Sequence, residues 1–322
     1  MCDKIFSVSE YVGDDGRRGL LVTLPWSYSL SDTLECGQCF RFEKIPSDSG
    51  ACEYLVNMSE LFATVKELGR GRLVFYGIDE EELYTVAAPL FSIDTDYGKI
   101  KRDVIEHTDS EWLHRAAEFA AGIAILKQDP WETLFSFIIS QNNNIPRIKR
   151  IIRELSGAYG VNLCLQKGYK SCPLSKISGT PCDEKCRECG FCYSFPSAEA
   201  VAAEPEKMLP SHPGFRYKYL LDAAERVASG ECDLTAIESQ GECDVAIAEL
   251  MKIHGVGLKV ASCTALFGLG YLDAFPIDVW MKRAIDEYFG GELDHLSLGS
   301  YRGVAQQYIF HYIRNGTPEG NN

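Results

Sequence analysis

Two closely spaced glycines between two helical segments constrain the fold of this chain more than any other feature. They stand in Ile-His-Gly-Val-Gly-Leu-Lys, residues 253–259. Residues 245–251 before them and 259–267 after them have the composition of helices. Gly255 and Gly257 permit a tight turn and a close approach of another backbone. We therefore predict a helix-hairpin-helix over about residues 244–268.

The predicted hairpin has a chemical consequence. The first amides of its second helix have no partner within the helix, which makes them an anion site suited to a nucleic-acid phosphate. Lys259 lies in the first turn of that helix. The positive end of the helix dipole favours the neutral, nucleophilic form of its amine. Most lysines are simply exposed surface residues, but this one is placed to attack C1′ of a bound sugar and displace the base.

Asp278 is the candidate partner of this lysine. It precedes a predicted helix at residues 279–289, so it is expected to be the N-cap. Capping alone is a sufficient structural role for it. A carboxylate held by helix amides also stays ionised, and it can then stabilise positive charge on a deoxyribose or help to activate the lysine. The two roles are compatible.

Composition indicates a globular protein that carries its nucleic-acid contacts locally. The 322 residues are 46% hydrophobic and 24% charged, and the net charge is −14. An acidic total is unusual for a protein that binds phosphates through basic side chains, but backbone amides carry no formal charge. The sequence shows neither a signal peptide nor an apolar run long enough for a bilayer. We expect an intracellular protein, cytoplasmic or nucleoid-associated, with no membrane partner.

The distribution of local signals predicts an α+β fold in two parts. Residues 1–108 contain short apolar segments separated by turn residues, at 20–24, 39–42, 53–56, 61–65 and 72–76, which favours an antiparallel β domain. Residues 109–322 are mainly helical. Thr108 with Glu111, and Asp129 before Pro130, indicate helix starts. We expect the β domain to pack on the helical domain that contains the hairpin.

A cysteine-rich insertion at about residues 166–192 interrupts the helical part. Cys182, Cys186, Cys189 and Cys192 are spaced closely enough for a tetrahedral thiolate site, with Cys172 as a possible substitute. Thirteen cysteines in an intracellular chain argue against a disulfide framework. We expect a structural zinc there, with a loop of free thiols as the alternative. No cofactor is expected for the lysine chemistry.

Several segments in order along the chain resemble the 8-oxoguanine DNA glycosylase family of the helix-hairpin-helix glycosylase superfamily. The resemblance runs from about residue 20 to residue 313, except for the insertion. Its strongest segments are residues 126–130, 134–138, 142–145, the hairpin and 275–278. A hairpin alone would be less specific, because polymerases and ligases also use one. The superfamily's iron–sulfur cluster lies beyond the catalytic aspartate, whereas the last cysteine here is Cys263. Zinc is therefore preferred to an iron–sulfur cluster as the metal of the insertion.

The resemblance implies roles at matching positions. Lys259 matches the catalytic lysine and Asp278 the catalytic aspartate. The base pocket corresponds to Gly37, whose carbonyl accepts from the damaged base, to Cys263 and Phe310, which sandwich it, and to Gln306, which reads its Watson–Crick edge. Among the DNA contacts, Asn142 matches the residue that fills the gap in the duplex, and Phe215 matches the wedge. Arg147 and Arg216 match the arginines that read the orphaned cytosine. Gly255 and Gly257 match the glycines of the hairpin.

Elementary chemistry agrees with part of this assignment. Guanine N7 is a hydrogen-bond acceptor, whereas N7 of 8-oxoguanine carries a hydrogen. A single backbone carbonyl can therefore distinguish the damaged base from guanine. An enzyme that acts on a base must first extrude it from the duplex. Three positions depart from the family pattern. This chain has Phe215 where the family often has a tyrosine, Trp280 where it has a phosphate-contacting histidine, and His254 where it often has a proline in the hairpin.

These observations favour a bifunctional DNA glycosylase and abasic-site lyase that removes 8-oxoguanine opposite cytosine from double-stranded DNA and acts as a monomer. The alternatives are a glycosylase for another lesion, a non-catalytic module that binds damaged DNA, and a thiol or metal sensor centred on the insertion. The presence of both Lys259 and Asp278 argues against a non-catalytic module.

Overall fold

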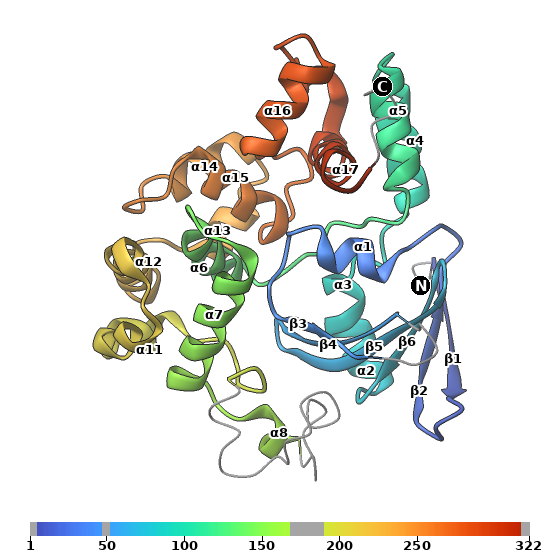
Figure 1. Ribbon diagram of the computed structural model, residues 1–322. Helices are drawn as coiled ribbons and strands as arrows, with labels where there is room; N and C mark the ends of the chain where they lie inside the picture. Colours follow the sequence, from blue (N-terminus) through green and yellow to red (C-terminus); the bar gives the residue numbers. More distant parts are fainter. Residues whose placement is uncertain (1–4, 47–51, 168–189, 317–322) are drawn as a thin grey trace.

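An antiparallel six-stranded sheet forms the N-terminal part of the computed structural model, which describes residues 5–46, 52–167 and 190–316. The strand order is β1-β2-β6-β5-β4-β3, so neighbours in space are mostly neighbours in sequence (Figure 1). The strands are β1 (Ser7–Val12), β2 (Arg18–Thr23), β3 (Phe42–Lys44), β4 (Cys52–Met58), β5 (Leu61–Gly69) and β6 (Arg72–Tyr76). The predicted α+β class and antiparallel sheet are confirmed.

Local details of the N-terminal part differ from the prediction. β1 and the helix α1 (Leu30–Glu35) were not anticipated, and β3 begins later than the predicted strand at 39–42. After the last strand, helices begin at Glu80, within the part that was expected to be mainly sheet. Asp79 caps the first of them, and Asp96 caps α4 (Tyr97–Glu106). These two caps were signals available in the sequence.

Helices make up most of the remaining described chain. After α2 (Glu80–Glu82), a π-helical turn and α3 (Ala88–Leu90), they are α4, α5 (Glu111–Phe119), α6 (Pro130–Ser140), α7 (Ile145–Tyr159), α8 (Leu163–Gln166), α11 (Ala198–Ala203), α12 (Tyr217–Ala228), α13 (Leu234–Ser239), α14 (Cys243–Leu250), α15 (Leu258–Phe267), α16 (Val279–Tyr288) and α17 (Arg302–Asn315). Ser110, not Thr108, caps α5, whereas Asp129 caps α6 as predicted. None of these helices is long and apolar enough to cross a bilayer.

The sheet and the helical part share one hydrophobic core. Buried side chains of the strands belong to the same cluster as those of α6, α15 and α17. A buried ion pair also joins the two parts: Arg41 Nη1 lies 3.4 Å from Glu132 Oε2, and the amide of Ser59 donates to the same oxygen at 3.1 Å. α6 is thereby held against the sheet, and it ends at the turn that lines the candidate site.

Candidate active site

The predicted helix-hairpin-helix is formed by α14, α15 and the turn between them. The amide of Val256 donates to the carbonyl of Ile253 at 3.0 Å. Gly255 has a φ of +82°, in the left-handed region that favours glycine. Gly257 is the N-cap of α15. Within the described chain, the amides of Gly255 and Gly257 donate no hydrogen bond, so they are available to an anion.

His254, one of the departures from the family pattern, has a defined role in the hairpin. Its amide donates to Asp222 Oδ2 at 2.8 Å, and its ring lies 5.0 Å from the ring of Tyr219. A proline at this position has no amide hydrogen and would not make the first contact. α12, which carries Asp222 and Tyr219, therefore anchors the hairpin from outside the motif.

We expect the two glycines of the hairpin to respond differently to alanine. A Cβ at Gly255 would collide with the Tyr219 ring on a backbone that L side chains rarely adopt, so Gly255→Ala should lower the free energy of unfolding by about 1–3 kcal/mol. A Cβ at Gly257 meets no atom within 4 Å. Gly257→Ala should keep wild-type stability. It should weaken duplex binding by roughly tenfold, because the added methyl group blocks the path of the DNA phosphate to the hairpin amides. Chemical denaturation and fluorescence anisotropy measure the two effects, and equal binding by Gly257→Ala and wild type would contradict the assignment.

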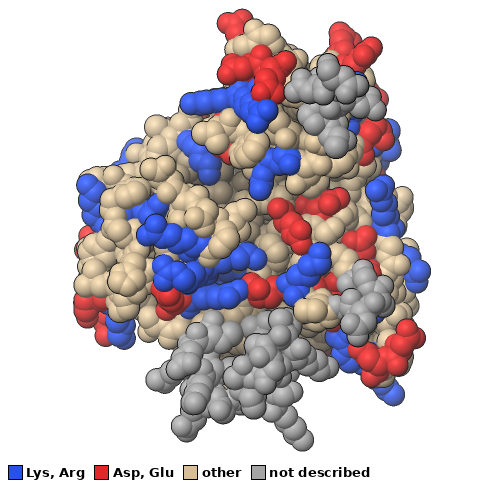
Figure 2. Space-filling view, viewed as in Figure 1, with Lys and Arg blue, Asp and Glu red and all other residues tan. Residues whose placement is uncertain are grey.

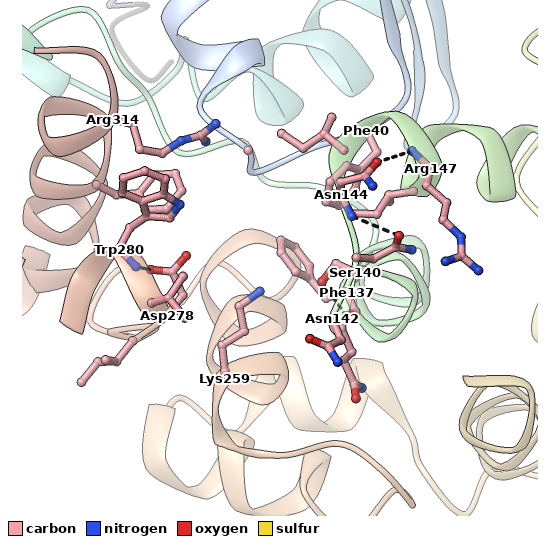
Figure 3. A pocket seen from close by; sticks show the side chains of 18 of the residues that line it. Phe40, Phe137, Ser140, Asn142, Asn144, Arg147, Lys259, Asp278, Trp280 and Arg314 are labelled. Atoms are coloured by element: carbon pink, nitrogen blue, oxygen red, sulfur yellow. Dashed lines mark hydrogen bonds between the residues drawn. The ribbon is translucent and has the colours of Figure 1, made fainter. Parts of the chain in front are cut away.

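A cavity of about 730 Å³ opens beside the hairpin, between the sheet side and the helical part. In Figure 3, Lys259 and Asp278 extend into it from α15 and from the start of α16. The Nζ of Lys259 lies 4.8 Å from the ring centroid of Phe137. Neither Lys259 nor Asp278 forms an ion pair with any described residue. Neither side chain is therefore held by an ion pair, and both face the cavity.

Asp278 is the N-cap of α16, as predicted. Its Oδ1 accepts from the amides of Trp280 at 3.0 Å and Met281 at 2.9 Å. Two amide donors on one oxygen hold the carboxylate in place. The second oxygen forms no hydrogen bond within the described chain, so the capping role and a chemical role are geometrically compatible.

The predicted base-pocket residues lie at two depths. Gly37 and Phe310 line the cavity. Cys263 and Gln306 are more deeply buried, each 3% exposed, and are not part of its open lining. Burial raises the pKa of the Cys263 thiol, which keeps it protonated. A buried, protonated thiol suits the wall of a pocket better than the role of a nucleophile.

The loop that carries Gly37 is held by a residue that the sequence analysis did not single out. Gln38 is fully buried, and its Nε2 donates to the carbonyls of Thr33 and Ala124, both at 2.8 Å. Its Oε1 accepts from the amide of Leu126 at 2.8 Å, and its own carbonyl accepts from Gln128 Nε2 at 2.7 Å. Gly37 itself has a φ of +89°. These contacts fix the position of the Gly37 carbonyl.

The predicted DNA-contacting residues cluster around the turn between α6 and α7. Asn142 is exposed there with a left-handed φ of +53°, and Arg147, also exposed, lines the cavity. Phe215 is 51% exposed, as a wedge requires. The Nε2 of Gln141 donates to the Gly255 carbonyl at 3.0 Å, so this turn is tied directly to the hairpin.

Arg216 occupies a different environment from the other DNA-contacting candidates. It is 3% exposed, and it donates to the carbonyls of Gln141 at 2.8 Å, Asn142 at 3.0 Å and Pro213 at 3.2 Å. These hydrogen bonds hold the turn that carries Asn142 in place. Its implied contact with the orphaned cytosine stays a prediction, since most of its donors are already used.

Cations outnumber carboxylates at the cavity despite the acidic total. Among the described residues, its lining contains Arg147, Lys259, Lys282 and Arg314, against a single carboxylate, Asp278. Figure 2 shows that Lys and Arg side chains also gather over α7 on the same face, while a group of acidic side chains lies nearer the sheet. The local charge therefore suits a polyanion.

Sequence analysis missed several lining residues for identifiable reasons. Phe40 and Phe137, with ring centroids 5.6 Å apart, form an apolar wall near Lys259. In the sequence they could not be distinguished from ordinary core residues. Arg314 follows Phe310 by one helical turn, a spacing that was a usable signal. Trp280, noted as a departure, lines the cavity and is 37% exposed.

The candidate zinc site lies almost entirely outside the described residues. Cys172, Cys182, Cys186 and Cys189 belong to the part that the structure leaves undescribed, whereas Cys192 is buried against Cys164 and Phe191. Among the described side chains, no group of three or more His, Cys, Asp or Glu residues is arranged to hold a metal ion. The structure thus offers no support for zinc.

A hairpin with free amides beside a cationic cavity is the arrangement expected of a helix-hairpin-helix DNA glycosylase. Residues 24–134 match the family model of the 8-oxoguanine DNA glycosylase N-terminal domain. The structure of Clostridium acetobutylicum 8-oxoguanine glycosylase/lyase, in complex with double-stranded DNA containing cytosine opposite 8-oxoguanine, has a TM-score of 0.78 and 31% identity over 97% of this chain and 98% of that chain. The chain belongs to the 8-oxoguanine DNA glycosylase family.

Two curated relatives agree with this assignment. The N-glycosylase/DNA lyase of Saccharomyces cerevisiae is 29% identical, over 89% of this chain and 84% of its own length. The corresponding protein of Arabidopsis thaliana is 27% identical, over 88% of this chain and 76% of its own length. The match therefore covers both the sheet and the hairpin.

Proposed function

We propose that this protein is a bifunctional DNA glycosylase and abasic-site lyase that excises 8-oxoguanine opposite cytosine. The observation that carries the proposal is the placement of Lys259 and Asp278 in one cavity beside the hairpin's free amides. The named activities of the relatives, N-glycosylase/DNA lyase and 8-oxoguanine glycosylase/lyase, support the same reaction.

The chemistry follows from the groups in the cavity. The hairpin amides bind a backbone phosphate and bring the sugar of an extruded nucleotide to Lys259. As the bond between C1′ and N9 breaks, positive charge develops on the sugar, and the Asp278 carboxylate stabilises it. The neutral amine of Lys259 bonds to C1′, and the base leaves with the electron pair of the broken bond.

Strand cleavage then follows from the covalent adduct. Opening of the sugar ring and loss of a proton from nitrogen give an imine between Lys259 and C1′. The imine acidifies the C2′ hydrogen, so removal of that proton expels the 3′ phosphate by β-elimination. Water finally releases Lys259 from the product. The nucleophile is a side chain of the protein, and no cofactor enters any step.

Recognition of the lesion is assigned to the pocket beside this chemistry. The carbonyl of Gly37, fixed by the Gln38 contacts, accepts the N7 hydrogen that 8-oxoguanine has and guanine lacks. Cys263 and Phe310 are proposed to enclose the base, and Gln306 to read its Watson–Crick edge. Asn142 and Phe215 are proposed to occupy the space in the duplex, and Arg147 with Arg216 to select cytosine.

Borohydride trapping on defined duplexes tests the proposed function. Wild-type protein should form a covalent adduct with a duplex containing 8-oxoguanine, fastest when cytosine is opposite. An adduct with another lesion but not with 8-oxoguanine would favour a glycosylase of different specificity. Duplex binding with neither adduct nor base release would favour a non-catalytic damage-binding module.

The assembly and location of the protein are further parts of the proposal. The enzyme is proposed to act as a monomer. Its DNA substrate supports an intracellular, nucleoid-associated or cytoplasmic location. Analytical ultracentrifugation with and without duplex measures the first, and fractionation of cells the second.

A structural zinc in the cysteine-rich insertion is a separate, testable prediction. If Cys182, Cys186, Cys189 and Cys192 form a tetrahedral thiolate site, protein purified without added metal should contain about one zinc per chain. Elemental analysis measures this ratio. A chelator that removes the metal should lower thermal stability without preventing borohydride trapping, because Lys259 needs no metal. A ratio near zero favours the loop of free thiols.

A further inference from the structure

Arg314 is a cationic residue of the cavity with no role in the reaction proposed above. It follows Phe310 and Gln306 on α17 at intervals of one helical turn, so the three side chains share one helix face. Figure 3 shows its guanidinium extending into the cavity. The guanidinium carbon lies 5.1 Å from the ring centroid of Phe310. Arg314 forms no ion pair or hydrogen bond with any other described residue.

The guanidinium lies beside the loop that carries Gly37. A Cβ placed on Gly37 would be 3.7 Å from Arg314 Nη1 and 3.7 Å from the Phe310 ring. A backbone acceptor, an aromatic face and a set of unused guanidinium donors thus border the same space. A partly buried cation with unused donors is suited to an oxygen ligand from outside the chain.

The chemical difference between 8-oxoguanine and guanine matches this combination. The lesion has a hydrogen on N7 and a carbonyl oxygen, O8, on the adjacent carbon, so its altered edge presents a donor next to an acceptor. We propose that Arg314 donates to O8 while the Gly37 carbonyl accepts from N7, which makes Arg314 a specificity-determining residue for the lesion. This inference rests on the proposed function, and it adds the second half of the lesion's recognition.

The same contact would assist the reaction. When the bond from C1′ to N9 breaks, the base receives the electron pair, and its negative charge spreads from N9 to O8. A guanidinium on O8 stabilises that charge more strongly in the transition state than in the bound substrate, so it accelerates base release. The Arg314 guanidinium has no O8 atom to contact once the base is absent.

Single-turnover kinetics of Arg314→Gln on two substrates test the proposal. With a duplex containing 8-oxoguanine opposite cytosine, excision should fall by about 10- to 100-fold. With the same duplex carrying a preformed abasic site, strand cleavage and borohydride trapping should stay within about twofold of wild type. Arg314→Lys, which keeps the charge without the planar donors, should recover part of the excision rate.

Lys282→Gln is the matched control, since Lys282 is another cation of the cavity lining. It should weaken binding to both duplexes alike, as loss of a general electrostatic contact does. If Arg314→Gln lowers cleavage of both substrates equally, or lowers only DNA affinity, Arg314 binds a phosphate and the proposal is wrong. Unchanged excision of 8-oxoguanine also overturns it. If wild-type protein cleaves abasic DNA but does not release 8-oxoguanine, the proposed lesion has failed instead.

Discussion

Replacement of Lys259 by glutamine is expected to abolish borohydride trapping and to lower 8-oxoguanine excision by at least about 10³-fold. The side chain supplies the bond to C1′, and glutamine has a similar length without a nucleophilic amine. Lys259 is partly exposed and forms no ion pair with a described residue, so the substitution should leave the free energy of unfolding nearly unchanged. Gel analysis of trapped adducts and single-turnover excision measure the loss.

Lys252 supplies a matched control for this substitution. It lies in the same hairpin, is exposed, and pairs with Glu249 on the neighbouring helix end. Lys252→Gln should trap as well as wild type. Trapping by Lys259→Gln at the wild-type rate would place the nucleophile elsewhere and would remove the central argument for the proposed mechanism.

Replacement of Asp278 by asparagine is expected to lower excision by about 10²- to 10³-fold while α16 stays intact. Asparagine keeps an oxygen that accepts from the Trp280 and Met281 amides, but it loses the charge that stabilises the positive sugar. Asp278→Ala should lose the cap as well, and it should lower the free energy of unfolding by about 1 kcal/mol. Comparison of the two variants separates the structural role from the chemical one.

A measurement of duplex affinity makes the Asp278 prediction sharper. Loss of a negative charge beside the DNA should leave duplex affinity equal or higher, so a fall in excision cannot come from weaker binding. Asp233→Asn is the control, because Asp233 caps α13 in the same manner and does not line the cavity. If Asp278→Asn excises 8-oxoguanine at the wild-type rate, capping is the whole role of this carboxylate.

Much of the fold was predictable because its signals are local. The cap at Asp129 with Pro130 and the cap at Asp278 depend on residues a few positions apart. The helices at residues 80–106 were missed although Asp79 and Asp96 cap them in the same way. The short strands that precede these helices gave residues 1–108 the overall pattern of a sheet.

By itself, the sequence determined the hairpin, its glycines and the candidate pair Lys259 and Asp278, since turn geometry and capping arise from neighbouring residues. Only the tertiary structure decided what surrounds that pair. Gln38 holds the Gly37 loop through contacts with residues far along the chain, and Arg314 approaches Gly37 from the opposite end of the chain. Such contacts depend on how α6 and α17 pack on the N-terminal part, and that packing comes from a core shared by the whole molecule.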